Sequence, residues 1–277
     1  MESNSQTRPS GLRYEVRDGV ALLTLDRPGR GNGLTVDLGD DLARAWAAVR
    51  DDPAIRVAIM TGSGDRHFCT GADVGTAEFA GDAPRNDGPY DQDVRYTARQ
   101  NSVWKPVICA VNGLVAGAGL HFVVDADIVL AAETVAFMDT HVSVGQIGAI
   151  ENIGLTRRLP LGSALRMTLM GKHYRMPAQR AYQLGLVDEV YPVEELLPAA
   201  DEMARLMMQG SPRAMAVSQE ALWKSLDMGY TQATDLGWAL VRSHWNHPDV
   251  TEGPKAYTER RQPQWQPPRA GRDYRLR

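Results

Sequence analysis

Two glycine-rich segments carry the residue types from which chemistry is expected in this chain. In the first, an apolar β-branched run from Val107 to Val111 stops at Asn112-Gly113 and is followed by Gly117, Ala118 and Gly119. Small residues let a ligand approach the backbone closely. A strand, a tight turn and a helix start direct free N–H groups at an anion. That anion is a phosphate or a developing oxyanion.

The second segment repeats this pattern earlier in the chain. An apolar run from Val57 to Thr61 ends at Gly62 and Gly64, and Gly71-Ala72-Asp73 then opens a new segment. The spacing predicts another buried strand that ends in a turn with exposed backbone. Two such turns supply two sets of N–H donors.

A dinucleotide-binding fingerprint is the rival interpretation of the central glycines. That fingerprint needs a third small residue three positions after the second glycine, where helix and strand pack closely. Here the position is Phe122, and the preceding strand ends well before Gly117. The pattern therefore disfavours a nucleotide cofactor.

The elements that position these segments alternate between strand and helix. Asp18-Gly19 predicts a hairpin, and apolar residues at helical spacing predict an amphipathic helix over 37–50. The strands are expected at Leu12 to Arg17, Val20 to Leu25, Val57 to Thr61, Val107 to Val111, Ile128 to Ala131 and Val187 to Tyr191. This alternation favours an α/β fold with parallel sheet.

Length and composition limit the function classes. The 277 residues carry a net charge of -4, so the sequence shows no excess of basic residues of the kind that binds nucleic acid. The two cysteines, Cys69 and Cys109, lie in apolar runs and are expected to be buried. The N-terminus lacks a signal peptide, and no apolar run approaches the ~20 residues of a membrane span. We therefore expect a soluble cytoplasmic protein that binds neither nucleic acid nor membrane.

Four parts are expected along the chain. A disordered polar tail at 1–11 precedes a core at 12–195, a helical region at 196–266 and a basic tail at 267–277. Ser211 as N-cap and Pro212 at the first helical position predict a helix start in the third part. The Gly-, Pro- and Asp-rich stretch from Phe79 to Tyr90 predicts a loop, which is either a substrate lid or a plain surface loop.

Taken in order, the motifs resemble the crotonase superfamily, the enoyl-CoA hydratase/isomerase family, over nearly the whole chain. The resemblance rests on these stretches: Arg27-Pro28 to Leu34, Phe68 to Asp73, Lys105 to Gly119, Asp127 to Ala132, Gly185 to Asp188 and Ala256 to Arg261. It implies a spiral of strand-strand-helix turns with a helical C-terminal region. It also implies an acyl-CoA substrate, no separate cofactor or metal, and assembly into a homotrimer or a dimer of trimers.

The same resemblance assigns an oxyanion hole and an acid/base pair. The N–H groups of Ala72 and Ala118 would hold the thioester oxygen as it becomes an enolate. The two positions where typical hydratases have glutamate hold His121 and His141, twenty residues apart. Imidazole has a reference pKa of about 6.5 and can serve as base or acid near neutrality. We expect a neutral His121 as general base and His141 as acid or water-orienting group, with Glu151 as a further candidate.

Coenzyme A is expected to meet basic residues near the first loop and at the C-terminal helix. These are Arg27, Arg30 and Arg260, with Gly71, Asp73 and Gly117 beside the thioester. Two alternatives stay open. A pair of histidines with Glu151 or Asp139 is loosely similar to superfamily hydrolases that cleave β-diketones without CoA. A non-catalytic acyl-CoA-binding protein that lost its carboxylates is the third possibility.

Overall fold

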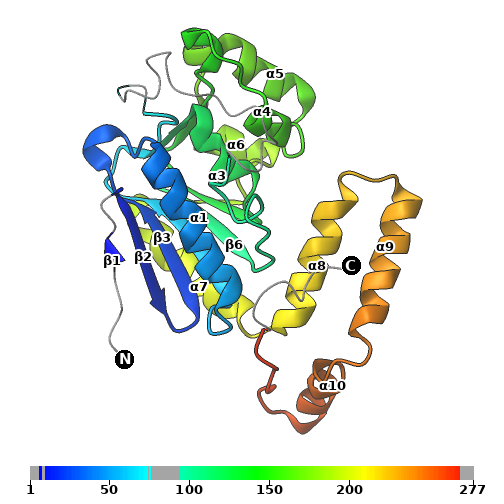
Figure 1. Ribbon diagram of the computed structural model, residues 1–277. Coiled ribbons are helices and arrows are strands. Elements are labelled where there is room, and N and C mark those ends of the chain that lie inside the picture. The colour runs from blue at the N-terminus through cyan, green and yellow to red at the C-terminus, as the bar shows by residue number, and fades with distance from the viewer. Residues whose placement is uncertain (1–5, 8–9, 74, 76–93, 269–277) are drawn as a thin grey trace.

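The computed structural model describes residues 6–7, 10–73, 75 and 94–268 of the chain. The expected loop from Phe79 to Tyr90 and most of the basic tail lie outside these residues. Within the described part, the chain forms two sheets, a set of covering helices and a helical arm (Figure 1).

The main sheet has seven strands in the order β1-β2-β3-β4-β6-β8-β11. β1 and β2 pair antiparallel, β2 pairs antiparallel with β3, and every later neighbour is parallel. The strands are β1 (Gln6–Thr7), β2 (Leu12–Arg17), β3 (Val20–Leu25), β4 (Val57–Gly62), β6 (Val107–Val111), β8 (Ile128–Ala132) and β11 (Glu189–Tyr191). β4 and β6 are buried at every position, as the apolar runs predict.

The second sheet has four strands in the order β10-β9-β7-β5. They are β5 (His67–Cys69), β7 (Leu114–Ala116), β9 (Ala136–Met138) and β10 (Met176–Pro177). The pairs β4/β5, β6/β7 and β8/β9 each give one strand to the main sheet and the next to this sheet. Repetition of that step is the spiral of strand-strand-helix turns, so the expected fold class is confirmed.

Helices cover the two faces of the main sheet. Figure 1 shows α1 (Val36–Asp51) in front of the strands and α7 (Leu196–Met207) behind them. Thr35 caps α1 by accepting a hydrogen bond from the N–H of Leu38 at 3.2 Å. Trp46 on the same helix is 1% exposed and anchors the core. Because α7 packs on β4, β6 and β8, the sheet core extends past residue 195, where the helical region was expected to begin.

Three helices form an arm that projects from the core (Figure 1). They are α8 (Pro212–Ser225), α9 (Tyr230–His244) and α10 (Asp249–Glu259). Ser211 accepts a hydrogen bond from the N–H of Ala214 at 3.2 Å, which confirms the expected N-cap. Within the residues that the structure describes, no helix has both the length and the apolar character needed to cross a bilayer.

The expected elements match the observed ones closely, with two corrections. Gln6 and Thr7 were placed in a disordered tail, but they pair with β2, which offers an unpaired edge. The last strand begins at Glu189 rather than Val187, because Val187 and Asp188 still belong to the turn after α6 (Ala178–Leu184). Cys69 and Cys109 are fully buried, and burial raises the pKa of the Cys69 thiol to about 12.

Candidate active site

The glycine-containing turns that follow β5 and β7 lie against each other. Leu34 bridges to Ala72, which ties the first loop to the second. Gly71 has a φ of +86°, and a Cβ there would lie 3.0 Å from the backbone N of Ala118. Only glycine permits this approach, and it places the two expected oxyanion segments side by side.

The N–H groups of Ala72 and Ala118 are available as donors. Ala118 is the second residue of the short helix η3 (Gly117–Gly119), so its N–H has no partner inside the helix. The hydrogen bonds between described residues give neither N–H an acceptor. The helix α3 (Leu120–Val124) continues directly from η3. The two expected oxyanion donors thus lie at adjoining turns and have no acceptor among the described residues.

His141 lies beside the same turn. A Cβ on Gly117, whose φ is +51°, would meet Thr140 Oγ1 at 3.1 Å and His141 Cε1 at 3.6 Å. His141 begins the short helix η4 (His141–Val144), which follows β9 after two residues. Its side chain is 19% exposed, whereas those of His121 and Glu151 are each 6% exposed. Of these three expected catalytic groups, His141 is therefore the most accessible to a substrate.

A fully buried carboxylate holds the His141 ring. Asp139 Oδ1 lies 2.6 Å from His141 Nδ1 and also accepts the His141 backbone N–H at 3.0 Å. The hydrogen bond to Asp139 raises the pKa of His141 above its usual value. Burial opposes ionisation of Asp139, yet the hydrogen bonds from His141 and Asn152 keep its pKa low. The Nδ1 proton faces Asp139, so Nε2 is the nitrogen left for chemistry.

Two residues that sequence reasoning missed complete this pocket. Asn152 donates to Asp139 Oδ2 at 2.7 Å and to Thr168 Oγ1 at 3.0 Å. A Cβ on Gly148 would come within 2.6 to 2.9 Å of Asn152 Nδ2, Asp139 Oδ2 and His141 Nδ1. No local pattern marks either residue, because their partners are brought together only by the fold.

Glu151 lies between the two histidines. It occupies the second position of α4 (Ile150–Leu155), and its Oε1 lies 3.2 Å from His141 Nδ1. Its Oε2 lies 3.3 Å from His121 Nε2. Burial raises the pKa of Glu151, although the neighbouring His141 opposes the shift. Within the described structure, Glu151 Oε1 is buried and accepts no hydrogen bond.

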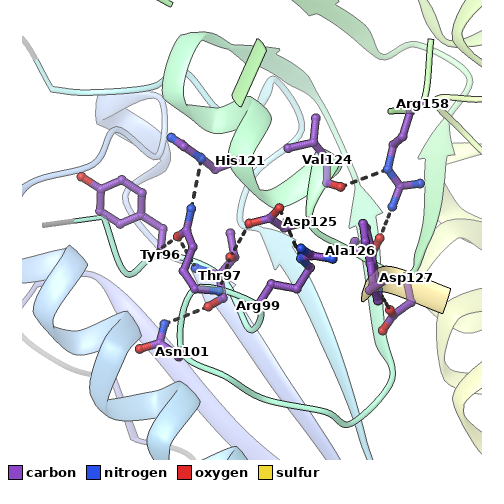
Figure 2. Close-up of polar contacts among 12 residues, drawn as sticks. Tyr96, Thr97, Arg99, Asn101, His121, Val124, Asp125, Ala126, Asp127 and Arg158 are labelled. Atoms are coloured by element: carbon purple, nitrogen blue, oxygen red, sulfur yellow. Dashed lines mark hydrogen bonds and ion pairs between the residues drawn. The ribbon is translucent and has the colours of Figure 1, made fainter. Parts of the chain in front are cut away.

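His121 is the most enclosed member of the cluster. Its Nδ1 lies 3.2 Å from Gln100 Nε2, a contact drawn in Figure 2, and the ring of Tyr96 packs edge-on at 5.8 Å. Burial, and then the charge of His141, lowers the pKa of His121 to about 4. The expected neutral state therefore has burial as its main cause. Gln100 was not foreseen from the sequence.

The residues expected to meet coenzyme A are only partly brought together. Asp73 forms ion pairs with Arg27 at 2.9 Å and Arg30 at 3.1 Å, so part of their charge is compensated. The Arg30 side chain is 59% exposed and remains open to a phosphate. Arg260 is the C-cap of α10, and Figure 1 shows α10 on the arm, well away from α3. Within one chain it does not join the other two arginines.

The described residues hold no group of three or more His, Cys, Asp or Glu side chains arranged for a metal ion. The site thus presents two backbone donors, one accessible imidazole with a carboxylate behind it, and a buried Glu151–His121 pair. This arrangement can polarise a carbonyl oxygen and move a proton on the carbon atoms next to it.

Known proteins resemble this chain over most of its length. A family model described as enoyl-CoA hydratase/isomerase matches residues 15–268. An (E)-benzylidenesuccinyl-CoA hydratase of Thauera aromatica is 31% identical over 91% of this chain and 97% of its own. A carnitinyl-CoA dehydratase of Salmonella arizonae is 33% identical over 92% and 97%.

Solved structures give the same result for the fold. A crystal structure of an enoyl-CoA hydratase/isomerase from Mycobacterium paratuberculosis superposes with a TM-score of 0.83 and 36% identity, covering 92% of this chain and 98% of the other. An enoyl-CoA hydratase from Mycobacterium tuberculosis H37Rv superposes with a TM-score of 0.84 and 27% identity, covering 93% and 99%.

Proposed function

Because the chain belongs to the enoyl-CoA hydratase/isomerase family of the crotonase superfamily, we propose that it acts on an acyl-CoA thioester through an enolate. The thioester oxygen would accept hydrogen bonds from the N–H groups of Ala72 and Ala118. Loss of one such donor costs about 3 kcal/mol of transition-state stabilisation in enzymes that use them. The observation that carries the proposal is the accessible His141 beside these two turns.

In the hydration of an enoyl thioester, His141 would act first as base and then as acid. Its Nε2 removes a proton from water as the water oxygen bonds to the β-carbon. The electron pair of the carbon–carbon double bond moves toward the thioester oxygen, which the two N–H groups stabilise. The enolate then collapses, and its α-carbon takes the proton from His141. Asp139, 2.6 Å from Nδ1, makes the imidazole a stronger base and fixes its orientation.

Glu151 is the second ionisable group beside His141 in this proposal. Its Oε1 lies 3.2 Å from His141 Nδ1 and accepts no hydrogen bond from a described residue. When ionised, the Glu151 carboxylate offsets the positive charge that His141 gains in each cycle. His121 lies on the other side of that carboxylate.

The test is hydration of crotonyl-CoA, followed by loss of the enoyl absorbance, in wild-type protein and His141→Ala. We expect turnover in the wild type and a severe loss in the variant. Calorimetry with acetyl-CoA measures binding separately. Failure of every acyl-CoA tested to bind would refute the proposed function. Binding of several acyl-CoAs without any turnover would favour the non-catalytic acyl-CoA-binding protein.

A second candidate function is hydrolysis of a carbon–carbon bond in a β-diketone. The contact between Asp139 and His141 favours it, because a carboxylate-backed imidazole activates water for attack on a carbonyl carbon. Attack at one carbonyl would expel the carbon between the two carbonyls as an enolate. Cleavage of a β-diketone in the absence of CoA, without hydration of crotonyl-CoA, would decide for this alternative.

We further propose a homotrimer or a dimer of trimers in the cytoplasm. Large apolar side chains on the arm are exposed, with Leu222 at 71%, Trp238 at 55% and Trp245 at 54%. An exposed apolar surface of this kind favours a protein interface. Sedimentation at micromolar concentration is the test, and a monomer there would refute the assembly.

A further inference from the structure

The side-chain amide of Gln100 has a fixed orientation. Its Oε1 accepts the backbone N–H of Tyr96 at 2.8 Å and that of Thr97 at 3.1 Å. Both donors are N–H groups, so the atom that faces them must be the amide oxygen. The NH₂ group therefore points to the other side, toward His121.

The two backbone donors are themselves held in place. Trp46 Nε1 donates to the carbonyl of Tyr96 at 2.7 Å, and Asn101 Nδ2 donates to the carbonyl of Thr97 at 2.8 Å. Thr97 Oγ1 also bonds Asp125 at 2.7 Å, as Figure 2 shows. The turn cannot rotate to offer a carbonyl to Gln100 without breaking these contacts.

An amide NH₂ only donates, so the nitrogen that it meets must accept. Gln100 Nε2 lies 3.2 Å from His121 Nδ1, which consequently carries no proton in the neutral ring. The single ring proton is then on Nε2, the atom 3.3 Å from Glu151 Oε2. The hydrogen bonds thus run from the backbone through Gln100 to His121, and the Nε2–H of His121 faces the Glu151 carboxylate.

We infer that Gln100 is a positioning residue that holds neutral His121 in the Nε2–H tautomer, so that His121 donates toward Glu151 and does not act as a base. This differs from the general-base role expected from the sequence. With Oε2 facing the His121 N–H, Oε1 is the carboxylate oxygen of Glu151 that lies beside His141. The tautomer follows from contacts alone, and only its effect on turnover rests on the proposed function.

The surroundings of His121 keep the ring neutral. The groups that face it are Gln100, the Tyr96 ring, Glu151 on α4 and His141 on η4. Its side chain is only 6% exposed, and burial is the first cause of a pKa lowered to about 4. Near neutral pH the choice is therefore between two neutral tautomers.

Nitrogen NMR of the full protein labelled with ¹⁵N-histidine tests the tautomer directly. The chain has six histidines, and a His121→Gln sample identifies the resonances of His121. At neutral pH we expect Nε2 to show the shift of a protonated nitrogen and Nδ1 that of an unprotonated one. A protonated Nδ1 in the wild type would overturn the inference.

Gln100→Glu replaces the hydrogen-bond donor beside His121 Nδ1 with an acceptor. A carboxylate accepts, so Nδ1 would need a proton, and the ring would change tautomer or become a cation with a pKa raised by about one or more. Gln100→Ala removes the donor without adding charge and should leave a mixture of tautomers, so it serves if Gln100→Glu does not fold. Gln183→Glu on exposed α6 is the charge-matched control and should leave His121 unchanged. An unchanged Nε2–H tautomer in both Gln100 variants would refute the role of Gln100.

Kinetics separates this inference from the proposed function. Gln100→Glu should lower kcat on the acyl-CoA substrate about 10-fold, the weight of one hydrogen bond to a charged group, with little change in KM. A KM effect without a kcat effect would count against the positioning role. A wild-type protein inactive on every acyl-CoA, yet with the Nε2–H tautomer, would sink the proposed function and leave the tautomer standing.

Discussion

His121 and His141 lie on opposite sides of one carboxylate, yet their environments shift their pKa values in opposite directions. His141 faces Asp139 and is partly open, and its pKa is raised. His121 faces an amide and is enclosed, and its pKa is lowered to about 4. The two histidines of the site therefore differ in how readily each takes up a proton. The partner at Nδ1 and the degree of burial decide which one exchanges protons.

The largest expected effect separates the accessible histidine from the enclosed one. His141→Ala should lower kcat about 1,000-fold, within the range for a positioned proton-transfer group. Acyl-CoA binding should change little, because the donors at Ala72 and Ala118 remain. His121→Gln keeps a donor toward Glu151 and should lose far less. Equal losses of kcat in the two variants, measured on one substrate, would contradict the different roles of His141 and His121.

The pH dependence of stability should report the enclosed histidine. A group with a lowered folded-state pKa contributes stability that is present above its unfolded pKa and is lost as pH falls through the folded value. For His121 the window runs from about 6.5 down to about 4 and corresponds to about 3 kcal/mol. Chemical denaturation across this window should show the loss in the wild type. If His121→Gln shows the same slope, other groups cause it.

His141 should contribute to stability with the opposite sign. Its raised pKa means that the contribution is present below the unfolded value of about 6.5 and is lost as pH rises through the folded value. The stability contribution of His121 is therefore lost as pH falls, and that of His141 is lost as pH rises.

Gly148→Ala tests how tightly the His141 side is built. The new Cβ would come within 2.6 to 2.9 Å of Asn152, Asp139 and His141. Overpacking of this kind typically costs about 2 kcal/mol of unfolding free energy. Gly162→Ala, inside helix α5 (Leu161–Met170) with open space around it, is the matched control. We expect that control to be neutral or slightly stabilising, and an equally harmless Gly148→Ala would contradict the packing described.

Asp139→Asn should give the smallest of these effects. It tests whether Asp139 causes the raised pKa of His141. Removal of the carboxylate charge lowers the pKa of His141, so the ionisation of kcat/KM that belongs to His141 should move to lower pH. The rate should fall about 10-fold, the weight of one hydrogen bond to a charged group. An unmoved profile would mean that Glu151 alone sets the ionisation.

Much of the fold was predictable because its signals are local. The apolar run Val107 to Val111 is β6 residue for residue, and Gly117 to Gly119 form the turn that presents Ala118. The start of α8 at Pro212 followed from the adjacent Ser211. The boundary expected at 195 has no such local signal. Whether α7 belongs to the core depends on what it packs against, not on its own helical pattern.

The residues by themselves predicted an α/β fold with parallel strands and two glycine-rich turns, and the family resemblance added the spiral and drew attention to His121 and His141. Only the tertiary structure decided their partners. Gln100 reaches His121 from a separate segment, and Asn152 reaches Asp139 from the next helix. Protonation depends on burial and on which atom faces which, and both arise from contacts between segments distant in the chain. Residue type therefore indicates what a side chain can do, and the folded surroundings select one of its states.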